Sequence, residues 1–70
     1  YTPMEFVLYI LERFFNKSQG EAEAIMLEAH EKGVSVAGVY TFEIAETKVY
    51  QVTQTAKEAH YPLQVRLEPA

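Results

Sequence analysis

The chain has 70 residues, a formal net charge of −4 at pH 7 and no cysteine. This length allows one small domain, and the lack of cysteine excludes disulfides, thiol catalysis and cysteine-bound zinc. The acidic balance disfavours a nucleic-acid-binding protein, which needs a basic face, and the longest apolar run is far too short to span a bilayer.

The first element that the sequence predicts is a helix ending near Asn16. Thr2 is a candidate cap for this helix, Pro3 suits its first position, and Glu5 completes a capping box. Apolar residues then recur with the 3.6-residue period of an amphipathic helix. They are Phe6, Val7, Ile10, Leu11 and Phe14.

A second helix is predicted between Ser18, which opens a capping box with Glu21, and Gly33, which suits the left-handed position after a helix end. The turn between the two helices is short, so we expect them to pack antiparallel. The residues that we expect to face inward on the second helix are Ala22, Ile25, Met26, Ala29 and His30.

Strand patterns flank a third predicted helix. Residues 34–40 alternate with period two and are rich in β-branched side chains, and residues 63–67 alternate as well. Between them, Thr41 can cap a helix that is broken near Pro62. The order is α-α-β-α-β, an α+β fold in which residues 1–70 form one domain. Two strands make a poor sheet for three helices, so we expect a further strand before Tyr1, giving a β-α-α-β-α-β sandwich with a small antiparallel sheet in the full-length protein.

Catalytic and metal-binding patterns are weak. His30 and Glu31 begin like a zinc-protease motif, but position 34 is Val34 rather than histidine, and His60 is far along the chain. Ser18 suits a cap better than a nucleophile, and the glycines are isolated rather than grouped in a phosphate-binding loop. We therefore predict a protein that is not an enzyme and holds no metal or cofactor.

One titratable ring lies on an apolar helix face. Met26, Ala29 and His30 are spaced i, i+3 and i+4, so they share one side of the second helix. One interpretation is a core methionine beside a partly buried histidine. The other is a small pocket with walls of Met26 and Met4 and a rim of His30, because methionine adapts to varied apolar ligands. Such a pocket suits a peptide whose first residue is bulky.

A second open question concerns the start of the third helix. Glu43 and the run Ala45-Glu46-Thr47-Lys48 form either an exposed face of alternating charge or a docking surface for a partner.

Several runs of residues together resemble ClpS, the small bacterial adaptor family of the Clp protease. The resemblance covers all 70 residues, and the first and fourth of the following runs are its most specific parts. The runs are Tyr1-Thr2-Pro3-Met4-Glu5-Phe6-Val7, Met26-Leu27 with His30, Gly38-Val39-Tyr40-Thr41, Ala45-Glu46-Thr47-Lys48-Val49, and Pro62-Leu63.

The resemblance implies a cytoplasmic bacterial adaptor without catalytic activity of its own. The family binds proteins whose N-terminal residue is Phe, Tyr, Trp or Leu (N-degrons). It delivers them to the N-terminal domain of a ClpA- or ClpC-type AAA+ unfoldase, with no role for nucleic acid or membrane. By position, His30 matches the histidine at the substrate's α-amino end, and Glu43 and Lys48 match the unfoldase-docking surface. The side-chain pocket is matched by Thr2, Met4, Val7, Met26, Ala29 and Leu63.

This sequence departs from the family pattern in two respects. The family has Asn-Asp-Asp before the tyrosine that matches Tyr1, and the first strand and the N-terminal extension also precede it; none of these is among residues 1–70. Ala29 stands where we expect a larger branched residue such as valine. The resemblance therefore implies an adaptor core with a pocket that is wider than usual.

An assembly domain is the alternative. The predicted element order also resembles, at the level of the fold, the C-terminal domain of the ribosomal stalk protein, which is a non-enzymatic interaction domain. Such a domain has no need of a methionine and histidine pocket and favours a basic helix face instead. The side of the second helix that carries Met26 and His30 therefore distinguishes the two hypotheses.

Overall fold

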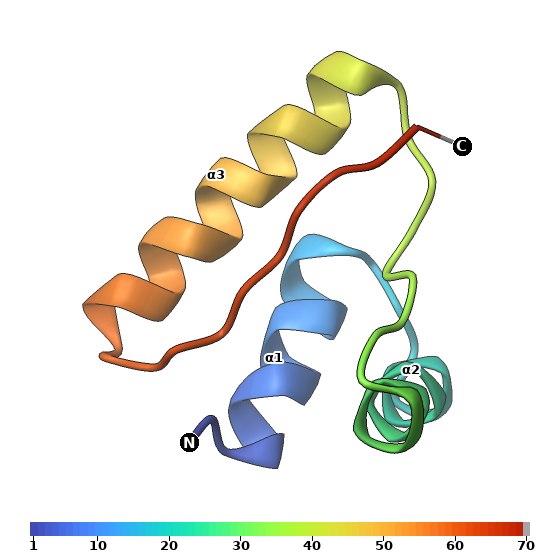
Figure 1. The fold of residues 1–70 in the computed structure, drawn as a ribbon, viewed down its shortest axis with the longest axis vertical. Coiled ribbons are helices and arrows are strands. Elements are labelled where there is room, and N and C mark those ends of the chain that lie inside the picture. The colour runs from blue at the N-terminus through green and yellow to red at the C-terminus, as the bar shows by residue number, and fades with distance from the viewer. Residues whose placement is uncertain (70) are drawn as a thin grey trace. The chain divides into compact units, whose positions relative to one another are not determined.

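The structure is a computed structural model that describes residues 1–69. It contains three helices, α1 (Met4–Phe14), α2 (Gln19–Lys32) and α3 (Phe42–Glu58) (Figure 1). The chain divides into two compact parts, residues 3–38 and residues 39–69 together with Tyr1 and Thr2. None of the described helices combines the length and apolar character that crossing a bilayer requires.

The start of α1 lies one residue later than the sequence predicted. Pro3 occupies the cap position, and no side chain bonds to the helix start. The Pro3 carbonyl accepts hydrogen bonds from the backbone N–H groups of Phe6 (3.1 Å) and Val7 (3.2 Å). The predicted capping box of Thr2 and Glu5 was therefore wrong, because with Pro3 as the cap Glu5 is the second helical residue and the box needs the third.

Helices α1 and α2 pack against each other within residues 3–38. Figure 1 looks almost along α2 while α1 runs across the view, so the two helices cross and the predicted antiparallel packing was wrong. Asn16, in the connection, has a left-handed backbone with φ of 54°, which redirects the chain before α2 begins. The buried side chains of this part are Ile10, Leu11, Phe15 and Ala22.

Both ends of α2 agree with the prediction. The backbone N–H of Glu21 donates to Ser18 Oγ at 3.2 Å, and the backbone N–H of Ser18 donates to Glu21 Oε1 at 2.9 Å. At the other end Gly33 is left-handed, with φ of 83°, and its N–H donates to the carbonyl of Ala29 at 2.8 Å. These local bonds satisfy backbone groups that the helix itself leaves without partners.

Replacing the cap of α2 should lower stability measurably. We expect Ser18→Ala to reduce the free energy of unfolding by about 1 kcal/mol, because both bonds of the capping box depend on this residue. In a domain of this size that corresponds to a fall in Tm of about 4–8 °C. Thermal unfolding followed by circular dichroism measures it, with Gln19→Ala as the matched control on the same exposed turn. An equal Tm for the two variants would show that the box is not stabilising.

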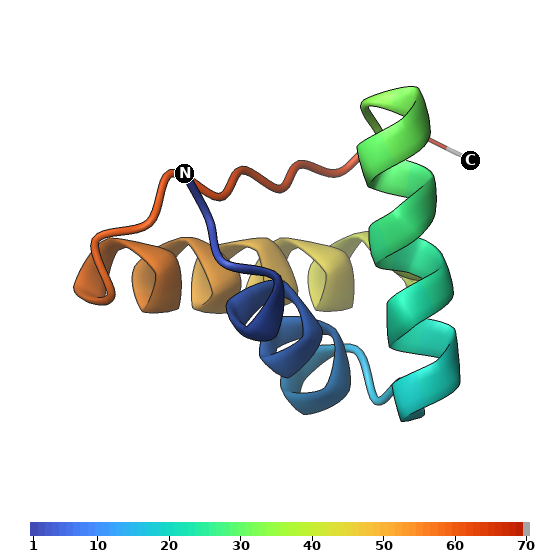
Figure 2. The ribbon, with the colours of Figure 1, turned by 90° about the horizontal axis from the view of Figure 1, so that it is seen from below.

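Helix α3 and the segment that follows it form most of the other compact part. Thr41 Oγ1 accepts from the backbone N–H of Ile44 at 3.4 Å, as the sequence predicted. After α3 ends, His60 adopts a left-handed backbone with φ of 62°, and residues 61–69 return alongside the helix (Figures 1 and 2). Val52 and Ala56 are the buried residues of α3.

The predicted strands at residues 34–40 and 63–67 are not formed. No strand is assigned anywhere in residues 1–69, so the strands of the predicted order α-α-β-α-β are not shown in this part of the chain, while its three helices are confirmed. The expected alternation is nevertheless visible, since Leu63 and Val65 are half-buried and Gln64 and Arg66 are exposed. A strand also requires a partner for its backbone groups, and alternation alone does not supply one. The complete sandwich stays a prediction.

Candidate binding site

Two of the predicted pocket residues lie on α1. Met4 begins the helix and is 64% exposed, and Val7, three residues later and so on the same side of the helix, is half-buried. The exposure of Met4 makes it available to a ligand.

Three more predicted residues lie on α2. Met26 and Ala29 are half-buried, and His30 is exposed in the last turn. The spacing i, i+3 and i+4 gives these three residues one side of the helix. The exposure of His30 removes the interpretation of this residue as a packed core histidine. An imidazole at the rim of an apolar surface is available to a polar group of a ligand.

The remaining two pocket residues lie in the other compact part of the chain. Thr2 and Leu63 are both half-buried there. The other five predicted residues, Met4, Val7, Met26, Ala29 and His30, lie within residues 3–38. The assembly of all seven into one pocket therefore stays a prediction.

The sequence did not predict two surface hollows. One, of about 540 Å³, lies over the face of α1 that carries Tyr9 and is lined by Glu5, Leu8, Tyr9, Glu12 and Arg13. The other, of about 340 Å³, is lined by Tyr40, Phe42, Ala45, Leu67, Glu68 and Pro69. Neither hollow contains a predicted pocket residue. Phe42, which lines the second hollow, is 64% exposed.

The two residues predicted to dock on a partner lie on α3. Glu43 is exposed in the first turn, and Lys48 is half-buried, with its Nζ 4.9 Å from the centre of the Tyr40 ring. Such a cation–π contact restrains the ammonium group, so Lys48 is not a freely solvated charge. Glu43 and Lys48 are five positions apart, about 140° around the helix, so they do not point in one direction.

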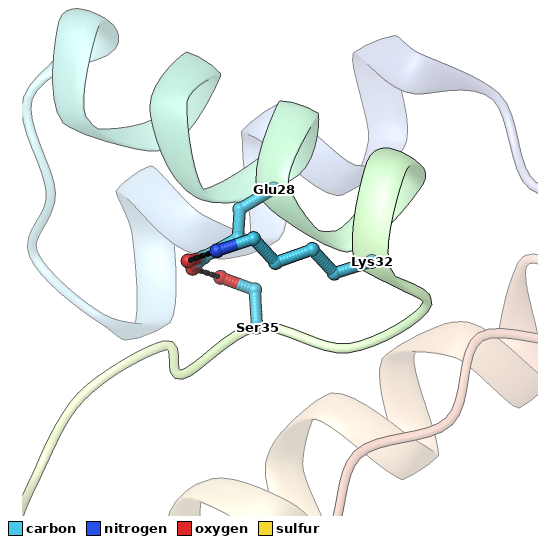
Figure 3. Close-up of polar contacts among 3 residues, drawn as sticks. All are labelled: Glu28, Lys32 and Ser35. Carbon is cyan, nitrogen blue, oxygen red and sulfur yellow. Dashed lines mark hydrogen bonds and ion pairs between the residues drawn. The ribbon is translucent and has the colours of Figure 1, made fainter.

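A cluster of three polar residues, which we call the Glu28 clasp, connects α2 to the segment after it (Figure 3). Ser35 Oγ donates to Glu28 Oε1 at 2.6 Å, and Lys32 Nζ lies 3.5 Å from Glu28 Oε2. The hydrogen bond from Ser35 and, next, the hydrogen bond and charge of Lys32 lower the pKa of Glu28 below its usual value. Sequence reasoning missed the clasp, because it placed Ser35 in a strand.

The clasp predicts a pH dependence. A carboxyl group whose pKa is lowered by folding adds stability above its ordinary pKa of 4.5 and loses it as the pH falls through the folded value. We therefore expect Glu28→Gln to lower Tm at neutral pH, and the difference from the wild type to shrink as the pH falls below 4.5 and through the lowered pKa of Glu28. Thermal melts across this range measure it, with Glu31→Gln as control. A difference that persists or grows in acid would contradict the assignment.

The described residues also limit the chemistry of the site. Within residues 1–69, no group of three or more histidine or carboxylate side chains is arranged to hold a metal ion. The predicted pocket residues supply apolar side chains, one hydroxyl and one imidazole. Such a set is suited to binding an apolar group with a polar end.

Comparisons with known proteins cover almost the whole chain. A sequence model of the family described as "ATP-dependent Clp protease adaptor protein ClpS" matches residues 1–66. This chain is 60% identical to two proteins named ATP-dependent Clp protease adapter protein ClpS, from Phenylobacterium zucineum (strain HLK1) and Caulobacter vibrioides (strain NA1000 / CB15N). Each match extends over 68 residues, which is 97% of this chain and 62% of the relative. The ClpS of Rhodospirillum centenum (strain ATCC 51521 / SW) is 59% identical over the same length, with 63% of it covered. The chain thus spans about three fifths of the length of these relatives. It belongs to the ClpS family of Clp protease adaptor proteins.

Proposed function

We propose that this chain is the substrate-binding core of an adaptor. It binds proteins whose N-terminal residue is Phe, Tyr, Trp or Leu and delivers them to a ClpA- or ClpC-type AAA+ unfoldase for degradation by the Clp protease. The observation that carries the proposal is the extent of the family match. It covers residues 1–66 and so includes every residue that we assign to the site.

The pocket for the first side chain draws on Thr2, Met4, Val7, Met26, Ala29 and Leu63. The exposed Met4 and the half-buried Met26 support this assignment, because thioether side chains are flexible and adapt to apolar groups of different shape. Burying an aromatic or leucine side chain among them gains about 1.5–3 kcal/mol. This gain is the apolar part of the selectivity for bulky first residues.

The α-amino group of the substrate is the polar part of the recognition. Burying an unpaired ammonium group is costly, so the site must offer it hydrogen-bond acceptors. His30 is exposed beside Ala29 on the same side of α2, and a neutral imidazole nitrogen accepts such a bond. We therefore assign His30 to the α-amino end of the substrate. An internal peptide segment has no charged amine, so it lacks the group that His30 would bind.

In this proposal the residues that dock on the unfoldase lie on a third helix, α3. Glu43 and Lys48 lie on α3, whereas the pocket assignment uses α1, α2, Thr2 and Leu63. An adaptor must hold its substrate and its unfoldase together, so two separate surfaces are required. The contact of Lys48 with Tyr40 keeps its charge in place for a carboxylate of the partner.

The proposal is tested by a titration of the full-length protein with fluorescent peptides that differ only in their first residue. Peptides that begin with Phe or Leu should bind, and the matched peptides that begin with Ser or Asp should bind at least tenfold more weakly. That factor corresponds to about 1.4 kcal/mol, less than the burial of one large side chain. Equal affinity across the series would contradict N-degron recognition and favour a general interaction domain.

Ala29 predicts a preference within the recognised class. Compared with valine, alanine leaves the space of about two methyl groups, on the order of 1–2 kcal/mol of contact for a ligand that does not fill it. We therefore expect Trp- and Phe-initiated peptides to bind more tightly than Leu-initiated ones, and Ala29→Val to reduce this gap by roughly 5- to 30-fold. The exposed Ala24→Val on the same helix is the matched control. Equal binding of Leu- and Trp-initiated peptides by the wild type would refute the idea.

A further inference from the structure

The Glu28 clasp bridges the end of a helix. Glu28 lies on α2, Lys32 is the last residue of α2, and Ser35 follows the left-handed Gly33 (Figure 3). The clasp therefore encloses the last turn of α2 in a loop of side-chain bonds. That turn carries the exposed His30.

The end of a helix opens readily without such a restraint. The last backbone carbonyl groups have no partners within the helix, and helix ends open at lower free energy than the core. The N–H of Gly33 donates a hydrogen bond to the carbonyl of Ala29 and so satisfies one of these groups. The next residue, Val34, is 65% exposed and gives little apolar anchoring. The bond from Ser35 to Glu28 is thus a main restraint on this segment.

The two bonds of the clasp are unequal. The hydroxyl of Ser35 donates to the carboxylate at 2.6 Å, the short distance of a charge-assisted bond. The ammonium of Lys32 is 3.5 Å away, and its side chain is 70% exposed, so its contribution is small. The restraint therefore depends on Glu28 and Ser35, with Lys32 as a minor partner.

We propose that Glu28 is a positioning residue which, through its hydrogen bond with Ser35, holds the last turn of α2 so that His30 and Ala29 keep a fixed orientation. The consequence for peptide binding rests on the function proposed above. The restraint itself does not, because it is a property of the free protein.

The test uses the full-length protein and its variants Glu28→Ala, Ser35→Ala, Ser35→Thr and the double alanine variant. Amide hydrogen exchange is measured at residues 30–36, with the core amides of Ile10 and Val52 as internal references. Affinity is measured with a Phe-initiated peptide. Glu31→Ala is the matched control, because Glu31 is an exposed carboxylate near the same helix end but outside the clasp.

Glu28→Ala and Ser35→Ala should each speed exchange at residues 30–36 about two- to fivefold. Exchange at Ile10 and Val52, which reports global unfolding, should speed up by no more than the same factor. The double variant should be no worse than either single one, since both remove the same bond, and Ser35→Thr, which keeps the hydroxyl, should restore the wild-type rate. Peptide affinity should fall by a similar factor in the two alanine variants and not in Glu31→Ala.

Other results decide against the proposal. Unchanged exchange at residues 30–36, or the same acceleration there in Glu31→Ala, would overturn the local restraint. Faster local exchange with undiminished affinity would overturn the positioning of Ala29 and His30. If the wild type binds no Phe-initiated peptide, the proposed function fails, and the exchange rates still decide whether the clasp acts as a restraint.

Discussion

Acetylation of the α-amino group of a Phe-initiated peptide is expected to weaken its binding by at least about 30-fold. The proposed site draws on the apolar side chain and on the charged amine at the same time. Acetylation removes the charge and two donors, and it leaves the acceptors at the His30 end of the site without their partner, which costs about 2–5 kcal/mol for a desolvated charged pair. Competition against a fluorescent Phe-initiated peptide measures the loss.

A peptide of the same sequence with a free N-terminus and an acetylated internal lysine is the matched control. It carries the same added group and the same change in charge, so only the position of the acetyl group differs. This control should compete as well as the unmodified peptide. Undiminished binding of the N-acetylated peptide would rule out recognition of the amine and leave His30 without the role that we assign to it.

Shortening one core side chain is expected to have the largest effect on stability. Ile10 is 2% exposed and lies on α1. Replacing a buried isoleucine by alanine removes apolar contacts and leaves a cavity, which costs about 2–5 kcal/mol. A small domain has only about 5–15 kcal/mol in total. Ile10→Ala should therefore lose a large fraction of its free energy of unfolding, as urea denaturation measures.

The matched control for this variant is Leu27→Ala. Leu27 lies on α2, is 54% exposed, and loses a side chain of the same volume. Its replacement should change the free energy of unfolding by less than about 0.5 kcal/mol. A cost for Ile10→Ala below about 1 kcal/mol, or equal costs for the two variants, would show that Ile10 is not at the centre of the packing.

The helices and most of their ends were predictable because their signals are local. Ser18 and Glu21 bond across three residues, Gly33 follows the end of α2 directly, and Thr41 caps α3 from the adjacent position. Where two local signals competed, the prediction was wrong by one residue. Pro3, with its fixed φ and no N–H, suits the cap as well as the first turn, and it took the cap position.

The strands and the helix crossing were not predictable in the same way. The alternation predicted the exposure of residues 63–66 but not that of Leu67, which is exposed. Strand assignment also requires a second segment at the correct spacing, which no local pattern encodes. The crossing of α1 and α2 follows from the backbone of the connection, including the positive φ of Asn16. A short turn alone predicts proximity of two helices and not their angle.

In the candidate site, too, the features set by helical spacing were predictable and the contacts made by irregular segments were not. The shared side of Met26, Ala29 and His30 follows from helical spacing, but His30 is exposed rather than facing inward as expected, while Met26 and Ala29 are half-buried. The bond between Glu28 and Ser35 and the contact of Lys48 with Tyr40 depend on how segments outside the helices fold back. These contacts join a helix to an irregular segment, and periodicity carries no information about them.

The central claim is that this chain binds an N-terminal residue, and its most direct test is chemical-shift mapping. The isotope-labelled full-length protein is titrated with a Phe-initiated peptide and, as control, with the matched Ser-initiated peptide. We predict that the Phe-initiated peptide alone shifts one set of signals, those of Thr2, Met4, Val7, Met26, Ala29, His30 and Leu63. Shifts confined to the hollows at Tyr9 or Phe42, or the same shifts with both peptides, would contradict the account.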